Sequence, residues 1–146
     1  MILTELFDSP VPYKWVQTDD RSGVATFQIG DSEYQFNAYA GGTEEYYPED
    51  DELPEVDIEF CRMVNNKCVQ DITGDSNANQ VFATVVAITR DYMNTHPVGA
   101  LMFSGKESNR QKLYLRMIKR LLPTWKITHR VNHTGGSFYA TPPTNL

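Results

Sequence analysis

The sequence contains few of the residues that identify a class of protein at once. Its 146 residues include two cysteines and three histidines, and their spacing matches no zinc-ligand pattern. It has no phosphate-binding GxxxxGK[ST] loop and no apolar run near the roughly 18 residues that a membrane-spanning helix needs. The N-terminus lacks a basic segment followed by an apolar one, which predicts no secretory signal. These absences predict a cytoplasmic protein that needs no metal and contacts no membrane.

The two cysteines, Cys61 and Cys68, flank a predicted turn at Asn65 and Asn66. A tight turn there places Met63 opposite Cys68 and leaves Cys61 two residues out of register. An intracellular chain also keeps its thiols reduced. We therefore expect two free thiols and no disulfide.

The composition is that of a globular protein, with 40% hydrophobic and 12% aromatic residues. A chain of this length can bury a core as one domain over residues 1–146. Its charge is unevenly distributed: residues 1–75 carry four basic and 17 acidic side chains, whereas residues 76–146 carry nine and two. Seven of the acidic residues lie within 43–55, which predicts a solvated loop there.

Residues 73–122 carry the clearest signals of secondary structure. Apolar residues recur at three- and four-residue spacing in two segments, and each segment opens with a capping box and stops at a proline. Between them, residues 98–103 are apolar on both alternating faces, which is typical of a central strand. The predicted helices begin near Asn77 and at Ser108 and end before Pro97 and Pro123.

Alternating apolar and polar residues predict antiparallel hairpins over 24–40, 56–73 and 125–140, and a short edge strand at 13–16. If 67–73 is a strand, a right-handed crossover would make it parallel to 98–103. We expect an α+β domain with a mixed, mostly antiparallel sheet covered by two helices. Its order would be β-hairpin, β-hairpin, helix, strand, helix, β-hairpin.

This order of elements resembles the GNAT acetyltransferase superfamily without its first two helices. Residues 100–104, with Asn109 and then Leu113-Tyr114, look like the late strand and helix of that superfamily. The resemblance implies that Asn109 contacts the arm of acetyl-CoA and that Tyr114 protonates the departing thiolate. It also implies a pyrophosphate-binding loop, which would here be formed by Thr73, Gly74, Asp75, Ser76 and Asn77.

Each of these catalytic interpretations has a structural alternative. Asp57 and Glu59 alternate on one predicted strand face and could deprotonate an amine, but alternate carboxylates on an exposed strand are usually only solvated. Tyr114 lies on an apolar helix face, where an aromatic usually belongs to the core. Residues 71–77 contain one glycine, two aspartates and no basic residue. We therefore predict a small GNAT-like accessory or protein-interaction protein, with an acyl-CoA-dependent N-acyltransferase as the alternative.

The second predicted helix carries a basic surface that suits a phosphate-rich partner, so nucleic-acid contact is a second alternative. The other interpretation is a solvated face partly neutralised by the acidic loop. The sequence around residues 73–82 and 103–114 also resembles small phage-encoded proteins, which implies a viral origin. The basic surface consists of Lys106, Arg110, Lys112, Arg116, Lys119 and Arg120.

Overall fold

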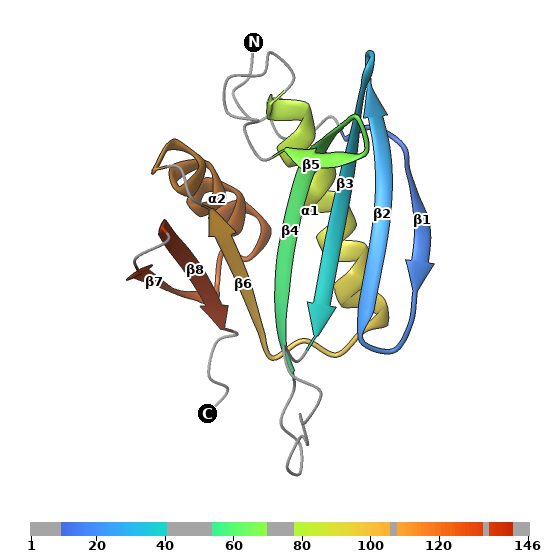
Figure 1. Cartoon of the computed structure of the whole chain (residues 1–146). Coiled ribbons are helices and arrows are strands. Elements are labelled where there is room, and N and C mark those ends of the chain that lie inside the picture. Colours follow the sequence, from blue (N-terminus) through green and yellow to red (C-terminus); the bar gives the residue numbers. More distant parts are fainter. Residues whose placement is uncertain (1–9, 41–53, 70–77, 106–107, 133–134, 142–146) are drawn as a thin grey trace.

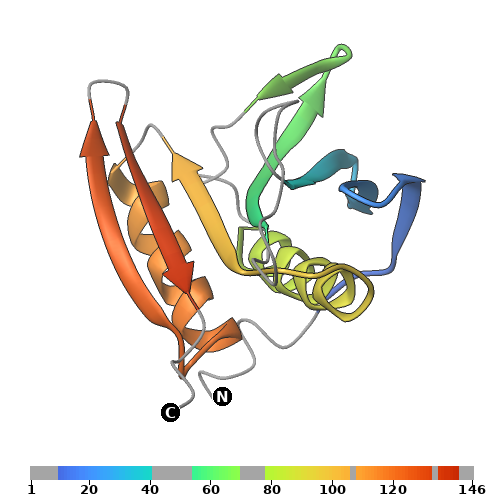
Figure 2. The same ribbon diagram turned by 90° about the horizontal axis from the view of Figure 1, so that it is seen from below.

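The computed structural model describes residues 10–40, 54–69, 78–105, 108–132 and 135–141, except the side chains of 104, 105, 108–113, 121, 129–132 and 135–137. In this part of the chain, two helices lie against one face of a single sheet (Figure 1). The view from below shows α1 and α2 on the same side of the strands (Figure 2). The elements are β1 (Tyr13–Thr18), β2 (Ser22–Ile29), β3 (Ser32–Ala40), β4 (Glu55–Val64), β5 (Lys67–Val69), α1 (Ala78–Thr95), β6 (Ala100–Gly105), α2 (Ser108–Leu121), β7 (Lys126–Asn132) and β8 (Gly135–Thr141).

The strands lie in the order β1-β2-β3-β4-β6-β8-β7, and β5 pairs with β4 outside this path. Strands β4 and β6 are parallel, and the other pairs are antiparallel. The predicted α+β class, its order of elements and its edge strand are confirmed. Asn65 and Asn66 adopt φ angles of 50° and 63°, the positive values that a two-residue hairpin turn requires.

The partner of the parallel pair differs from the prediction, which assigned residues 67–73 to it. Strand β6 pairs with β4 instead, from Glu55 opposite Ala100 to Ile58 opposite Phe103. The physical reason is burial: alternate residues of β4 are apolar and face the helices, whereas β5 has three described residues, of which two are exposed. A central position in the sheet therefore stabilises β4, because it buries the apolar side chains of this strand.

The core lies between the sheet and the two helices. Phe60 of β4 packs edge-on against Phe82 of α1 and Tyr114 of α2, with ring centroids 5.3 and 5.4 Å away. On the first edge of the sheet, Asp91 of α1 fixes β1, because its Oδ2 accepts hydrogen bonds from the Tyr13 hydroxyl at 2.8 Å and the Trp15 indole at 3.0 Å. Burial, the hydrogen bond to Asp91 and its charge raise the pKa of Tyr13 to about 12. The helices thus hold both the centre and the edge of the sheet.

Strands β4 and β6 pair at four positions and then separate toward their C-terminal ends (Figure 1). Since β3 pairs with one edge of β4, β5 and β6 must share the other edge. Strand β5 takes the positions from Arg62 to Val64, which lie beyond the point of separation. Residues 59–61 of β4 lie between the positions that pair with β6 and the described positions that pair with β5.

The prediction of free thiols is wrong: Cys61 and Cys68 form a disulfide, with their Cα atoms 5.4 Å apart. The predicted register is correct, since Met63 does lie opposite Cys68. Residues two apart on a strand share a face, so Cys61 and Cys68 are diagonal neighbours on one side of the hairpin. A directly opposite position is therefore not required for a bridge between the two strands.

Candidate functional site

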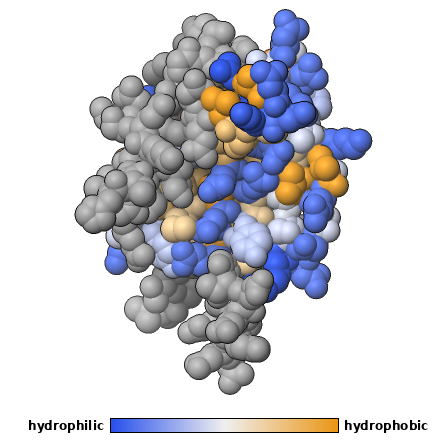
Figure 3. Space-filling model, in the orientation of Figure 1, coloured by the Kyte–Doolittle hydropathy of each residue, from blue (hydrophilic) through white to orange (hydrophobic). Residues whose placement is uncertain are grey.

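The face of the sheet that the helices leave uncovered carries the candidate site. One row of residues crosses this face: Tyr39 of β3 lies opposite Asp57 of β4, Asp57 opposite Met102 of β6, and Met102 opposite Tyr139 of β8. In the orientation of Figure 1, hydrophilic residues occupy much of the middle of this face (Figure 3). Half of the surface of Tyr39 is exposed. The row therefore places Tyr39 and Met102 on the strands directly beside Asp57, with Tyr139 one strand further away.

Three carboxylates alternate along this face of β4: Glu55, Asp57 and Glu59. Residues two apart on a strand are about 6 to 7 Å apart, so each carboxylate feels its neighbour. Burial and, to a smaller extent, the negative charges of Glu55 and Glu59 together raise the pKa of Asp57 to about 6. Within the described residues, the Asp57 carboxylate accepts no hydrogen bond and has no basic partner.

Glu55 has a partner, because the Tyr139 hydroxyl donates a hydrogen bond of 3.1 Å to its Oε2. Asp57 is different: it is half-buried among like charges and titrates close to neutral pH. A cation placed beside it would favour its ionised form and reduce the repulsion. The arrangement can therefore bind a positively charged group or accept a proton from an amine.

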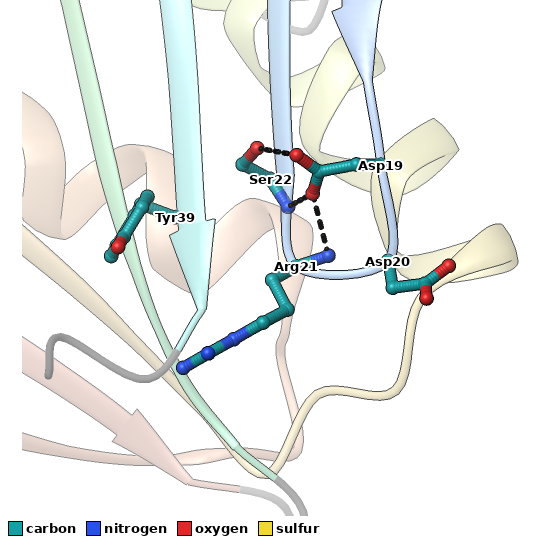
Figure 4. Close-up of a pocket in the computed structure, with 5 residues that line it drawn as sticks. All are labelled: Asp19, Asp20, Arg21, Ser22 and Tyr39. Carbon is teal, nitrogen blue, oxygen red and sulfur yellow. Dashed lines mark hydrogen bonds between the residues drawn. The ribbon is translucent and has the colours of Figure 1, made fainter. Parts of the chain in front are cut away.

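An open pocket of about 400 Å³ lies at the end of β2 and β3 and is lined by residues 19–22 and Tyr39. Figure 4 shows that Asp19 closes the turn, accepting hydrogen bonds from the backbone N–H groups of Arg21 (2.8 Å) and Ser22 (2.7 Å) and from the Ser22 hydroxyl (3.0 Å). These bonds lower the pKa of Asp19. Tyr39 belongs to both the pocket and the row, whereas Asp57 does not line the pocket.

Residues 49–137 of the chain match a known sequence family. The chain belongs to DUF6934, a family of unknown function. No curated protein matches the sequence. The DUF6934 region includes the three carboxylates of β4, both helices and β6, whereas β1 to β3 precede it. Tyr39 therefore lies outside the matched region and Asp57 inside it.

In this member of DUF6934, Tyr114 lies in the core. It is 1% exposed, and its ring packs against Phe60, Phe82 and Phe103. Phe60 points to the helix-covered face, so Tyr114 and Asp57 lie on opposite sides of the sheet. The structure thus does not bring the predicted acid and base together on one face. This position favours a packing role for Tyr114.

The predicted cofactor-binding residues cannot be placed as a group. Thr73, Gly74, Asp75, Ser76 and Asn77 lie outside the described residues, and Asn109 belongs to α2 without a described side chain. Of the predicted basic surface, Arg116 and Lys119 are exposed on α2 and Arg120 is half-buried. The side chains of Arg110 and Lys112 are not described, and Lys106 lies outside the described ranges. Nucleic-acid contact stays a prediction.

Sequence reasoning identified Asp57 and Glu59 as neighbours on one face, and the structure places them so. It missed Tyr39 and Tyr139. Their alternation with buried residues assigns each to the uncovered face. Tyr39 comes beside Asp57 only through the pairing of β3 with β4, and Tyr139 joins the same row only through the pairings of β4 with β6 and of β6 with β8. Among the described residues, no group of histidines, cysteines and carboxylates converges as metal ligands would. Nor is any helix in those ranges long and apolar enough to cross a membrane.

Proposed function

We propose that the protein is a GNAT-like interaction protein that binds a basic segment of a partner protein on the uncovered face of β4. The observation that carries this proposal is the environment of Asp57, which is half-buried between two further carboxylates and has no basic partner among the described residues. Burial and this repulsion both disfavour the ionised carboxylate, and a lysine or arginine side chain beside it would favour that form. Tyr39 and Tyr139 suit the same ligand, since cations bind the faces of aromatic rings.

The strand order supports the GNAT-like part of the proposal. A sheet of antiparallel strands with one parallel pair, separating beyond Ile58 and Phe103 and joined through α1, has the order on which the resemblance is based. Fold alone assigns no activity. A cytoplasmic location and a phage source complete the proposal, and fractionation of a tagged chain would test the location.

The described residues fit coenzyme A poorly at one point. A cofactor arm lying between β4 and β6 needs an unpaired strand edge, but β5 takes that edge of β4 from Arg62 to Val64. Three residues, 59–61, remain between the two partners. We therefore place protein interaction before acyl transfer.

Calorimetric titration with a five-residue lysine peptide tests the interaction. We expect binding that weakens as salt rises. The double change Asp57→Asn, Glu59→Gln should weaken it at least about tenfold, since removing one side of a close charge pair commonly costs more than 1.4 kcal/mol. A peptide with acetylated lysines should not bind.

Glu33→Gln is the matched control, because Glu33 is an exposed carboxylate of β3 whose partner is Met63, distant from Asp57 along the sheet. It should leave the affinity within about twofold, as expected for an exposed charge. If Glu33→Gln weakens binding as much as the double change, the peptide recognises net charge alone. That result, or no binding by the unchanged chain, rejects the proposed site.

An N-acyltransferase is the second candidate, and the pKa of Asp57 favours it. A carboxyl with a pKa of about 6 is suited to take a proton from an amine near neutral pH. Thermal denaturation with millimolar acetyl-CoA tests this candidate, because a ligand that prefers the folded state raises its melting temperature. A shift that persists in the double variant Asp57→Asn, Glu59→Gln would indicate cofactor binding apart from the acidic face. If acetyl-CoA does not raise the melting temperature, the interaction protein remains the proposed function.

A further inference from the structure

The two cysteines of the Cys61–Cys68 bridge differ in their exposure to solvent. Cys61 is fully buried in β4, whereas Cys68 is exposed in β5. Gln35 of β3 lies opposite Cys61, and the Sδ atom of Met63 is 3.9 Å from the Cys61 Sγ. The fold therefore covers one end of the bridge and leaves the residue at the other end open to solvent.

This difference selects the sulfur with which a thiol from solution reacts. In thiol–disulfide exchange a thiolate attacks one sulfur and expels the other, and access to the attacked sulfur is one of the factors that set the rate. Attack on Cys68 comes from the exposed end of the bridge, whereas attack on Cys61 requires a path past buried side chains. Exchange should thus begin at Cys68.

The same difference gives the two thiols separate roles once the bridge is open. Buried structural cysteines are inert toward reagents in solution, whereas exposed ones react. Cys61 nevertheless stays close to Cys68, because a sequence separation of only seven residues joins them through the turn at Asn65 and Asn66. Cys61 is therefore placed to react with a sulfur that Cys68 carries. An accessible cysteine beside a resolving cysteine is a common arrangement in redox sensors.

We propose that Cys68 is a site of reversible modification by a low-molecular-weight thiol of the glutathione class, and that Cys61 is its resolving cysteine. The inference does not depend on the function proposed above. It rests on the exposure of one cysteine, the burial of the other and their closeness along the chain.

The chemistry is an ordinary thiol–disulfide exchange in both directions. A glutathione thiolate attacks the sulfur of Cys68, the bond to Cys61 breaks, and Cys61 leaves as a thiolate that takes up a proton. Cys68 then carries glutathione in a mixed disulfide. In the reverse step, the Cys61 thiolate attacks the Cys68 sulfur and glutathione leaves as a thiolate. Each step exchanges one disulfide for another, so no further oxidant or reductant is needed.

Two single variants treated with glutathione disulfide test the assignment. Cys68 alone can react in Cys61→Ser, and Cys61 alone can react in Cys68→Ser. We expect Cys61→Ser to form the mixed disulfide at least about tenfold faster in native buffer, because its remaining thiol is the exposed one. Intact-mass measurement over time follows the reaction. In urea that unfolds both chains the rates should agree within about twofold, since burial no longer distinguishes the thiols.

A second measurement uses the unchanged sequence, so it does not depend on whether either variant folds. The chain is reduced, freed of reductant and treated with a limiting amount of iodoacetamide. Trypsin then cleaves after Arg62 and Lys67, which places the two cysteines on separate peptides. We expect at least about tenfold more label on Cys68 than on Cys61. Glutathione disulfide added to the reduced chain should restore the bridge and leave no lasting adduct.

Each part of the assignment has a result that overturns it. A smaller preference for Cys68 in the labelling of the unchanged chain, or a preference for Cys61, would show that exposure does not select the reacting sulfur. A glutathione adduct that persists on the unchanged chain would show that Cys61 does not resolve it. Failure of glutathione disulfide to restore the bridge would reject the reversible modification altogether.

Discussion

The two faces of β4 differ in whether the fold provides partners for their side chains. On one face, Val56, Ile58 and Phe60 are fully buried against the helices. On the other, Asp57 is half-buried between two carboxylates that repel it. The apolar face stabilises this fold and is explained by it. Burial and like charges disfavour the ionised Asp57, and under our proposal a bound basic segment offsets this cost.

The largest expected effect is the loss of unfolding free energy caused by a substitution on the apolar face. Phe60→Ala removes a ring that packs edge-on against Phe82 and Tyr114. Deleting a buried aromatic leaves a cavity and typically costs about 3–5 kcal/mol of unfolding free energy. Urea denaturation followed by circular dichroism measures this loss. A cost below about 1 kcal/mol would mean that the helix-covered face is not the main core.

The Cys61–Cys68 bridge does not follow the difference between the two faces of β4. Cys61 belongs to the acidic face by alternation, but it is buried. It closes a loop with a sequence separation of seven residues. Constraining so short a loop in the unfolded chain is worth about 2 kcal/mol. Reduction should lower the unfolding free energy by that amount, measured by urea denaturation with and without dithiothreitol. The variant Cys61→Ser, Cys68→Ser should show no further loss on adding the reductant.

Removing the charge of Asp57 should stabilise the folded chain. Asp57→Asn removes a charge that the fold disfavours, since burial and two like charges raise the pKa of this carboxyl to about 6. Because the side chain is half-exposed, we discount the full shift for solvent screening and expect a gain of about 1 kcal/mol at pH 7. This corresponds to a melting temperature higher by about 2–4 °C. Glu33→Gln should change stability by less than about 0.5 kcal/mol, and a loss of stability in Asp57→Asn would contradict the role given to its charge.

The same group gives a smaller, pH-dependent effect. The folded chain binds the Asp57 proton more tightly than the unfolded chain, whose aspartates titrate near 3.8. Raising the pH from about 4 to about 6 therefore removes a proton that favours folding, and the contribution of Asp57 to stability falls over this window. Above about pH 6 it should be constant. Since other carboxylates also titrate, the measurement is the difference in unfolding free energy between the unchanged chain and Asp57→Asn, which should grow from near zero at pH 4.

Much of the fold could be predicted because its signals are local. Asn65 and Asn66 indicate their own turn, and the alternation around Ile58 assigns each β4 residue to a face. The errors concern relations across strands. Choosing between β4 and β5 as partner of β6 depends on which strand buries more apolar surface. The Cys61–Cys68 diagonal depends on cross-strand geometry beyond the direct register.

Only the part of the candidate site that lies on a single strand could be predicted from the sequence, because its signal is local. Two residues on a single strand, Asp57 and Glu59, share a face by alternation alone. Tyr39 reaches Asp57 only through the register of β3 with β4, and Tyr139 only through two further pairings. The burial that raises the pKa of Asp57 likewise depends on all of these strands. Alternation along a single strand thus predicts which carboxylates share a face. Their burial and their neighbours on other strands depend on the pairing of the whole sheet.

The smallest expected effects are shifts in the pKa of Asp57 when one of its neighbouring charges is removed, and they distinguish the causes of its raised pKa. Burial is the largest cause, the charge of Glu55 the next, and the charge of Glu59 the last. Glu55→Gln should therefore lower the pKa of Asp57 more than Glu59→Gln does, and neither should restore the ordinary value of 3.8, because burial remains. NMR titration of the Asp57 carboxyl carbon measures each shift. If both changes together bring the pKa back to its ordinary value, charge repulsion rather than burial controls this face, and a bound cation would then relieve nearly all of its cost.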